Sequence, residues 1–369
     1  MIEQAWTEHR TIREVMLFLQ GHGLSTLFAV RIYKAYGDKA IAMITEDPYR
    51  LADDIYGISF FSADHVAWNI GLSENSHPRI LAAIKHVLAA SRERGHCYLT
   101  EPQINTCLNQ QIDINLGEQL KEYLDFMKHD GQLCTRLLYK NNVETIGYYS
   151  KALYYDETDV ATLLRGMKGP VAIEPDKIAQ WVSTYCQGKH IALSDEQTHA
   201  LNGVVQHRFS ILTGGPGCGK TTTTLVIVRL LEAMNKTVLL AAPTGRAAQR
   251  MSEVIGREAK TIHRLLEWKG GEFQRNEASQ LITNFLIVDE CSMLDISLTA
   301  AILKAVPSTC QVLFIGDPDQ IPAIGAGNVL RDMIASEVIP CFRLKQVFRQ
   351  AQASLIIQHA HQLNYHLLK

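Results

Sequence analysis

The chain has 369 residues, of which 47% are hydrophobic, and its formal net charge is −2. This length suffices for two or three domains, and the composition excludes an intrinsically disordered chain. The near-neutral charge argues against a wholly basic, histone-like binder, although a local groove of Lys and Arg is compatible with it. No apolar run approaches the roughly 20 residues of a membrane span, and the N-terminus has no signal-peptide pattern. We therefore expect a soluble, cytoplasmic protein with no membrane partner.

Residues 1 to 95 are predicted to form short helices separated by glycine turns. One helix-turn-helix has its turn at Gly21-His22-Gly23, and a second has its turn at Gly57-Ile58-Ser59. This weak repeat resembles a pair of helix-hairpin-helix units, in which backbone N–H groups of the turn face a DNA phosphate. Ser59 stands where the second glycine usually lies, and a plain helical packing module is an equal alternative because glycine turns between helices are common.

Residues 96 to 190 combine helices with a hairpin. Helical stretches are expected around 101–110 and 115–129, and residues 131–150 alternate like a β-hairpin with its tip at 140–142. Helices followed by a hairpin predict a small winged-helix-like α+β domain.

From residue 191 the pattern changes to an alternation of strands, loops and helices. Four short apolar runs end in small or acidic residues: FSILTGG, KTVLLAAPT, NFLIVDE and CQVLFIGDP. Such continuous apolar strands are buried on both faces, which predicts an α/β fold with a parallel sheet covered by helices. Functional groups collect at the carboxyl ends of such strands. We expect the third run to neighbour both the first and the fourth in the sheet.

The first run leads into GGPGCGKT, which fits the phosphate-binding pattern G-x-x-x-x-G-K-[ST] between a strand and a helix. Its glycines let several backbone N–H groups point at phosphates, and the helix N-terminus adds positive potential. Lys220 would bridge the β- and γ-phosphates, and the Thr221 hydroxyl would ligate Mg²⁺. The sequence therefore predicts a nucleoside triphosphate site formed by Gly214, Gly215, Pro216, Gly217, Cys218, Gly219, Lys220, Thr221 and Thr222.

The third and fourth runs end in polar groups suited to phosphate hydrolysis. Asp289 would hold Mg²⁺, and Glu290 beside it would orient and deprotonate the attacking water. Asp317, Asp319 and Gln320 follow the fourth run, and Gln320 would reach a γ-phosphate and report its loss. Adjacent acids favour hydrolysis over stable storage of the nucleotide.

Taken in chain order, the motifs resemble those of the RecD/TraA family of superfamily 1B DNA helicases, the 5′-to-3′ branch. The matching segments are LSDEQTHAL, GGPGCGKTT, AAPTGRAAQRM, TIHRLL, VDECSM, GDPDQIPAIGAG and QVFRQA. In the front half, VMLFLQGHGLS, DPYRLADDIYGISFFSADHVA and GHCYLT resemble the segment that precedes the motor in stand-alone RecD-like helicases. The resemblance implies a RecA-like P-loop NTPase fold for the motor.

The resemblance also implies roles for single residues. Gln197 should contact adenine and favour ATP, Gln320 should sense the γ-phosphate, and Arg349 should stabilise charge in the transition state. A second group should lie along single-stranded DNA: Pro243, Thr244, Arg246, His263 and Arg264. A solvated surface position is the alternative for Arg246 and Arg264, and a buried structural role is the alternative for His263.

These features divide the chain into four parts. We expect a helix-hairpin-helix domain at 1–95, a winged-helix-like domain at 96–190, RecA-like motor domain 1A at 191–345, and the start of a second RecA-like domain at 346–369. Complete family members continue with motifs V and VI, and usually carry a further helix-hairpin-helix stretch and an OB-like region at the front. The chain is therefore expected to be truncated at both ends.

The resulting hypothesis is the ATP- and DNA-binding N-terminal half of an ATP-dependent 5′-to-3′ DNA helicase of recombination or repair. ATP and Mg²⁺ are the expected cofactors, and single-stranded DNA or 5′-tailed duplex DNA is the expected partner. One alternative is the RecD-like alpha subunit of exodeoxyribonuclease V, with helicase–nuclease partner chains. Another is a DNA-anchored ATP-binding module that does not hydrolyse ATP. The helix-hairpin-helix front favours the stand-alone type.

Overall fold

The computed structural model describes residues 2–140 and 143–348, which belong to two compact units. The first unit consists of residues 1–91 and 98–151, and the second consists of residues 92–97 and of the chain from residue 152 onward. None of the described helices combines the length and the apolar character that crossing a bilayer requires.

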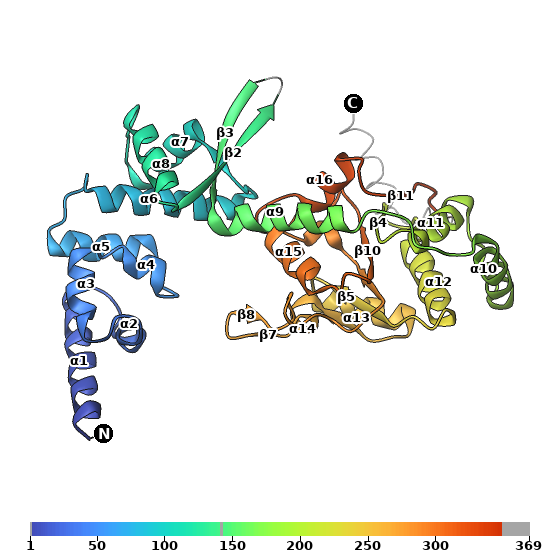
Figure 1. The fold of residues 1–369 in the computed structure, drawn as a ribbon, viewed down its shortest axis with the longest axis horizontal. Helices are drawn as coiled ribbons and strands as arrows, with labels where there is room; N and C mark the ends of the chain where they lie inside the picture. Colours follow the sequence, from blue (N-terminus) through green and yellow to red (C-terminus); the bar gives the residue numbers. More distant parts are fainter. Residues whose placement is uncertain (1, 141–142, 349–369) are drawn as a thin grey trace. The chain divides into compact units, whose positions relative to one another are not determined.

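The first unit begins with the two predicted helix-turn-helix elements (Figure 1). α1 (Ile2–Gly21) leads through a turn to η1 (Thr26–Phe28) and α2 (Ala29–Tyr36), and after α3 (Ala40–Glu46) the pair α4 (Arg50–Asp54) and α5 (Phe60–Ile70) repeats the plan. Gly23 and Gly57 have φ of +77° and +97°, which glycine adopts without a steric penalty. Ser59 stands where a glycine usually lies in this kind of turn. Its side chain caps α5, since its hydroxyl accepts the Ser62 N–H at 3.2 Å.

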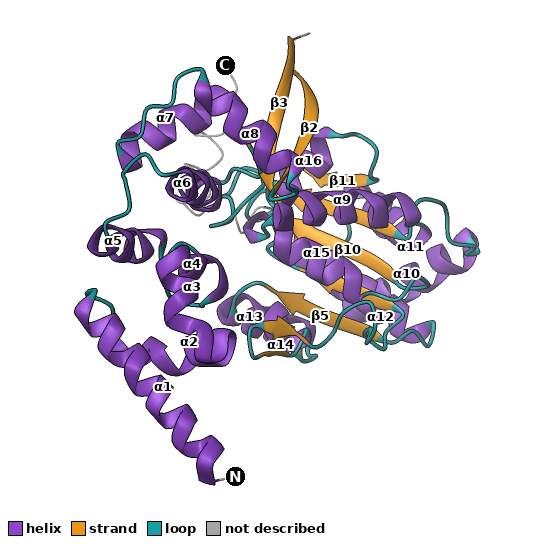
Figure 2. Cartoon of the chain, turned by 60° about the vertical axis from the view of Figure 1, so that its left-hand side comes forward, coloured by secondary structure: helices purple, strands orange, loops and turns teal. Residues whose placement is uncertain are grey.

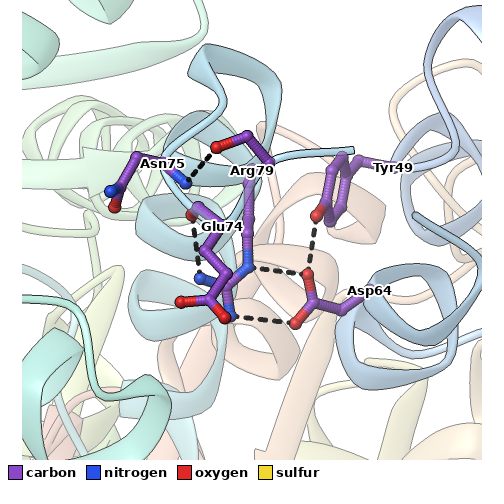
Figure 3. Close-up of polar contacts among 6 residues, drawn as sticks. Tyr49, Asp64, Glu74, Asn75 and Arg79 are labelled. Atoms are coloured by element: carbon purple, nitrogen blue, oxygen red, sulfur yellow. Dashed lines mark hydrogen bonds and ion pairs between the residues drawn. The ribbon is translucent and has the colours of Figure 1, made fainter. Parts of the chain in front are cut away.

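A largely buried ion pair joins α5 to α6 (His77–Ala90), as Figure 3 shows. Arg79 donates from Nε to Asp64 Oδ1 at 2.8 Å and from Nη2 to Asp64 Oδ2 at 3.1 Å. The Tyr49 hydroxyl donates to the same Oδ1 at 2.6 Å, and Arg79 Nη1 donates to the Glu74 carbonyl at 3.0 Å. Both charged side chains are only 12% exposed, so this bidentate pair holds the two helices together with little screening by solvent.

The remainder of the first unit contains the predicted hairpin. β2 (Leu133–Lys140) and β3 (Val143–Ser150) pair antiparallel, and the short strand β1 (Leu99–Thr100), which the sequence did not predict, adds to β3. The two predicted helices are α7 (Glu101–Ile112) and α8 (Gln119–His129). The tip residues 141–142 lie outside the described residues.

These elements share one core with the helical front. Leu124 of α8 and Tyr148 of β3 belong to the same apolar cluster as Leu19 of α1 and Ile32 of α2. Residues 98–151 therefore pack with 1–91 as one compact unit, whereas the sequence pattern indicated a division near residue 95. The difference arises because a change of secondary structure along the chain carries no information about whether two segments share a core.

The second unit is built on a six-stranded parallel sheet in the order β11-β4-β10-β9-β5-β6. Figure 2 labels three of its strands, β11, β10 and β5. The four predicted strands are β4 (Phe209–Gly214), β5 (Val238–Ala242), β9 (Phe285–Val288) and β10 (Gln311–Gly316). Two edge strands, β6 (Ala259–Thr261) and β11 (Cys341–Leu344), were not predicted. The predicted pairing of the third and fourth runs is confirmed, but the expectation that the first and third are neighbours was wrong. β10 lies between them, because crossover connections and not chain order decide which parallel strands pair.

Helices cover both faces of this sheet, which confirms the predicted α/β class. Along β10, Val312 and Phe314 belong to one core, whereas Leu313 and Ile315 belong to the other. The first core includes residues of α9 (Lys151–Gly166), α14 (Ile262–Leu265), α15 (Ile296–Ala305) and α16 (Val329–Ala335). The second includes residues of α10 (Pro175–Lys189), α11 (Asp195–Gln206), α12 (Lys220–Ala233) and α13 (Gly245–Ile255). In Figure 2, α9 and α15 lie on the same side of the sheet.

The assignment of α9 and α10 differs from the predicted domain plan, in which residues up to 190 preceded the motor. Leu153 and Val160 of α9 are buried in one core of the sheet, and Ile178 and Val182 of α10 are buried in the other. The apolar face of an amphipathic helix shows that the helix packs on something, but it does not identify the partner.

Candidate functional site

A cavity of about 1010 Å³ lies where β4, β9 and β10 end. It brings together most of the predicted nucleotide-site residues: Gln197, Gly215, Pro216, Gly217, Gly219, Lys220, Thr221, Thr222, Asp289, Glu290 and Gln320. Two predicted residues do not line it. Gly214 is the last residue of β4, and Cys218 is a buried side chain that packs into one of the two sheet cores.

The loop between β4 and α12 needs its glycines. Gly217 and Gly219 have φ of +80° and +81°, a left-handed backbone that favours glycine. A Cβ at Gly219 would clash with the Gln197 amide, and a Cβ at Gly214 would lie 2.7 Å from the Leu344 carbonyl oxygen. Because Gly219 is the N-cap of α12, the unpaired N–H groups of the first helical turn lie at the cavity.

The Lys220 ammonium group is held by the loop itself. Its Nζ donates to the carbonyl oxygens of Gly214 and Gly215, the latter at 3.1 Å. Phosphate oxygens carry more charge than these carbonyls and form stronger hydrogen bonds with a cation. A phosphate entering the cavity can therefore recruit the same ammonium donors.

Asp289 and Glu290 follow β9 directly and lie on the cavity wall. Burial raises the pKa of Asp289, and burial together with the neighbouring Asp289 charge raises the pKa of Glu290. The Glu290 N–H donates to Asp289 Oδ1 at 2.8 Å, and Glu290 has the left-handed φ of +55°. A non-glycine residue adopts this backbone only at an energetic cost. A glutamate with a raised pKa suits proton transfer.

A side-chain hydrogen bond joins the loop after β10 to the segment after Glu290. Asp317 is buried, and its Oδ1 accepts the Asp319 N–H at 3.1 Å, which fixes the turn. Gln320 lines the cavity, and its Oε1 accepts the Ser292 hydroxyl at 3.4 Å. Sequence reasoning found Gln320 but not Ser292, since no motif pattern indicates that these two loops meet.

Gln197 is 1% exposed and links the start of α11 to the phosphate loop. Its backbone N–H donates to Ser194 Oγ at 3.2 Å, while its own Oε1 accepts the Ser194 N–H at 2.9 Å. This is a capping box, which the S-x-x-Q spacing could have indicated. Its Nε2 donates to the Gly219 carbonyl at 3.2 Å. A contact with adenine stays a prediction.

Arg250 and Phe348 are among the cavity residues that the sequence analysis missed. Arg250 of α13 lines the cavity, and its charge opposes the rise of the pKa of both Asp289 and Glu290. Phe348 also lines the cavity, and its N–H donates to the Gly217 carbonyl at 3.3 Å. Arg349, predicted as a catalytic residue, lies outside the described residues.

The residues predicted to contact DNA lie beyond the ends of β5 and β6 and are not among the cavity-lining residues: Pro243, Thr244, Arg246, His263 and Arg264. Thr244 caps α13, where its hydroxyl accepts the Ala247 N–H at 3.2 Å. Arg246 is exposed, and the Arg264 side chain is 74% exposed with only a loose contact of 3.9 Å to Glu258. Both guanidinium groups are therefore accessible to a ligand.

An aromatic cluster, which the sequence analysis missed, lies beside α14. The rings of Trp268 in β7 (Trp268–Lys269) and Phe273 in β8 (Glu272–Phe273) have centroids 4.5 Å apart. The ring of His263 lies 6.0 Å and 5.5 Å from them, and His263 is exposed rather than buried. Trp268 is 48% exposed. Accessible aromatic rings next to cations are typical of sites that bind single-stranded nucleic acid.

Two family models match the sequence in separate regions. Residues 8–98 match the HHH domain of the ATP-dependent RecD2 DNA helicase, and residues 197–326 match an AAA domain. The first region contains both helix-turn-helix elements, and the second contains β4, β9, β10 and most of the cavity.

Known proteins match over different lengths. The ATP-dependent RecD2 DNA helicase of Deinococcus radiodurans is 32% identical over 366 residues, which are 97% of this chain and 50% of that protein. The RecBCD enzyme subunit RecD of Mycobacterium tuberculosis is 35% identical over 164 residues, 38% of this chain and 28% of its own. The chain thus spans about half the length of the first relative. A solved Pif1 helicase from Candida albicans matches 43% of this chain and 41% of its own at 26% identity, with a TM-score of 0.34 that is too low to bear on the fold.

Proposed function

Because the chain belongs to the RecD-like helicases of superfamily 1, we propose that its second unit is the ATP-hydrolysing and DNA-binding motor domain of a 5′-to-3′ DNA helicase. One observation carries the proposal: the phosphate loop, the two acids after β9 and Gln320 meet in one cavity although they come from three strands. The activity of the whole protein is part of the proposal, since the chain spans half of its RecD2 relative.

The residues of the cavity fit a nucleoside triphosphate with Mg²⁺. A Cβ at Gly214 or Gly219 would clash with neighbouring protein atoms, so only glycine allows the loop to pack this closely, and helical N–H groups lie beside the cavity. Thr221 and Asp289 both line the cavity and supply the hydroxyl and carboxylate oxygens that Mg²⁺ prefers. When bound, Mg²⁺ would offset the negative charge of the phosphates.

The other cavity residues have complementary tasks in hydrolysis. Lys220 moves its hydrogen bonds from the loop carbonyls to the phosphates. Glu290 orients the attacking water and accepts its proton, a task for which a raised pKa is favourable. Gln320 contacts the γ-phosphate, and its bond to Ser292 transmits the loss of that group to the segment after β9.

Single-stranded DNA is the proposed second ligand. Arg246 and Arg264 would bind phosphates, and the exposed Trp268 ring would stack on a base. Thr244, at the end of β5, would add a contact with the sugar-phosphate backbone of the DNA. Support comes from the accessibility of these groups and from their common origin at the ends of β5, β6 and α14. A cytoplasmic location belongs to this proposal.

The stand-alone helicase is favoured over a subunit of a helicase–nuclease complex. The relative named RecD2 aligns over nearly the whole chain, whereas the RecBCD subunit RecD of M. tuberculosis aligns over 38% of it. The RecD2 HHH model at residues 8–98 points the same way. A module that binds ATP without hydrolysing it is less well supported, because Asp289 and Glu290 both lie at the cavity.

The nucleotide site is tested by Lys220→Ala, with Lys177→Ala as the matched control. Lys177 is an exposed lysine of α10 that is paired only with Glu174 three residues earlier. In a titration with a fluorescent ATP analogue and Mg²⁺, Lys220→Ala should abolish measurable binding, and Lys177→Ala should bind like the parent chain. Equal affinities of all three proteins would contradict the site assignment.

The DNA part is tested separately by measuring ATP hydrolysis with and without a single-stranded oligonucleotide. Stimulation of turnover by the oligonucleotide is expected for the parent chain.

Glu290→Gln should still bind the nucleotide but should lose at least about 100-fold in turnover, the usual range for a general base. Unchanged turnover in this variant would remove Glu290 from the mechanism.

A further inference from the structure

The segment that follows β11 runs along the start of α11 to the cavity. The backbone N–H of Lys345 donates to Glu196 Oε2 at 2.7 Å, and the N–H of Gln346 donates to the same oxygen at 3.1 Å. Two residues later, the Phe348 N–H donates to the Gly217 carbonyl at 3.3 Å, and Phe348 lines the cavity. Glu196 itself is not among the cavity-lining residues.

A single carboxylate oxygen thus accepts two consecutive backbone donors of a segment that has left the sheet. Residues 345–348 belong to no helix or strand, so no ladder of hydrogen bonds holds them. Hydrogen bonds to a charged acceptor are stronger than those to a neutral one. Glu196 lies in the first turn of α11, where the helix dipole favours a negative charge.

Gln197, the residue next to Glu196, contacts the phosphate loop. Gln197 donates to the Gly219 carbonyl, and a Cβ at Gly219 would lie 2.8 Å from Phe348 Cε2. The Phe348 ring therefore packs directly on Gly219. Two consecutive side chains of α11 join the phosphate loop and the segment 345–348 into one wall.

We propose that Glu196 is a positioning residue, which holds residues 345–348 against the phosphate loop and so sets the Phe348 wall of the nucleotide cavity. The same two hydrogen bonds fix the part of the chain that immediately precedes Arg349 in the sequence. This inference rests on the proposed function of the cavity as a nucleoside triphosphate site.

The first test measures hydrogen exchange of the 345–348 amides without nucleotide. Glu196→Ala should speed their exchange by about tenfold or more, because local opening then costs fewer hydrogen bonds. Glu196→Gln should protect them nearly as well as the parent, since an amide oxygen also accepts both N–H groups. Asp195→Ala is the matched control, an exposed acid of the same helical turn. Unchanged exchange in Glu196→Ala would overturn the proposal.

The second test titrates the same three variants with a fluorescent ATP analogue and Mg²⁺. Glu196→Ala should bind about tenfold more weakly, a loss comparable to one charge-assisted hydrogen bond. Glu196→Gln and Asp195→Ala should stay within about twofold of the parent. If Glu196→Ala loosens the segment but keeps its affinity, or if Glu196→Gln is as weak as Glu196→Ala, the positioning role is refuted.

The two tests separate this inference from the function on which it rests. A parent chain that binds no nucleotide would refute the proposed function, whereas the exchange measurement would still decide whether Glu196 holds the segment. Melting curves of all variants should coincide within about 2 °C, since the hydrogen bonds concern a segment outside the sheet.

Discussion

At the residue scale, we expect the pair Asp289–Glu290 to destabilise the fold that contains it. Burial raises the pKa of both carboxyl groups, and the charge of Asp289 raises that of Glu290 further. Glu290 in addition adopts the left-handed φ of +55°. Ionised, like-charged groups in a partly buried turn and a strained backbone are features that folds retain at functional sites.

Asp289→Asn should therefore stabilise the protein at neutral pH while weakening the binding of ATP with Mg²⁺. The pKa of the Asp289 carboxyl is higher in the folded protein than in the unfolded chain, where it is about 4. Below about pH 4 the carboxyl therefore contributes to stability, and this contribution is lost as the pH rises through the folded-state pKa. The asparagine avoids this loss and still accepts the Glu290 N–H. We expect a gain of about 1 kcal/mol in unfolding free energy near pH 7.

The check is a series of thermal unfolding curves between pH 4 and pH 8. The advantage of Asp289→Asn should shrink toward zero as pH falls and the parent carboxyl becomes protonated. Asp195→Asn, a change at an exposed acid, should show no comparable gain. An advantage of Asp289→Asn that grows toward acid pH would mean that the direction of the pKa shift is wrong.

At the element scale, the contact between α5 and α6 depends on the buried pair of Asp64 and Arg79 (Figure 3). Arg79→Ala leaves Asp64 with the Tyr49 hydrogen bond but without its cationic partner, and removing one member of a buried pair costs about 3–5 kcal/mol. Chemical denaturation of the first unit should report a loss of this size.

Lys85→Ala is the matched control for that ion pair. Lys85 also bonds an aspartate, Asp53, at 2.7 Å, but the two side chains are 35% and 50% exposed. Exposed pairs contribute about 0–1 kcal/mol, so this variant should unfold nearly like the parent. Equal losses for Arg79→Ala and Lys85→Ala would show that burial does not determine the strength of the Asp64 pair.

A second element-scale prediction concerns α13 and α14, which carry the exposed Arg246 and Arg264. If both bind phosphates of single-stranded DNA, their joint replacement by alanine should reduce the slope of log affinity against log salt concentration. The expected change is about 0.7 per lost contact. Lys177→Ala with Lys189→Ala removes the same charge from α10 and should leave the slope unchanged. Identical slopes for both double variants would leave the arginines as solvated surface groups.

At the scale of the whole molecule, the chain contains two compact units with separate apolar cores. We expect two unfolding transitions in calorimetry. ATP with Mg²⁺ should raise the unfolding temperature of the second unit only. Binding increases the free energy of unfolding of that unit by RT ln(1 + [L]/Kd), which is about 2.7 kcal/mol at a ligand concentration of 100 times Kd. Arg79→Ala should lower only the other transition.

Each perturbation serves as the control for the other in this experiment. A single cooperative transition, shifted as a whole by both the nucleotide and the Arg79 substitution, would contradict the division into independently unfolding units.

Local patterns predicted the parts of this fold that depend on neighbouring residues. The four continuous apolar runs became the four central strands, and the glycine turns at 21–23 and 57–59 separate helices as expected. The phosphate loop could be recognised because its glycines and lysine must stand at set intervals along one segment. The short edge strands β6 and β11 were not predicted, since three or four residues are too few to show a periodic pattern.

The sequence by itself determined which residues form the phosphate loop and the acid pair, because each lies in one contiguous motif. The DNA contacts followed from the family resemblance and stay a prediction. Only the tertiary structure decided that β10 lies between β4 and β9, that α9 and α10 pack on the motor sheet, and that Gln320 bonds Ser292. The same holds for the two hydrogen bonds of Glu196 to residues about 150 positions away. Strand order and distant contacts follow from how whole faces are buried against one another, and no local pattern encodes which face meets which.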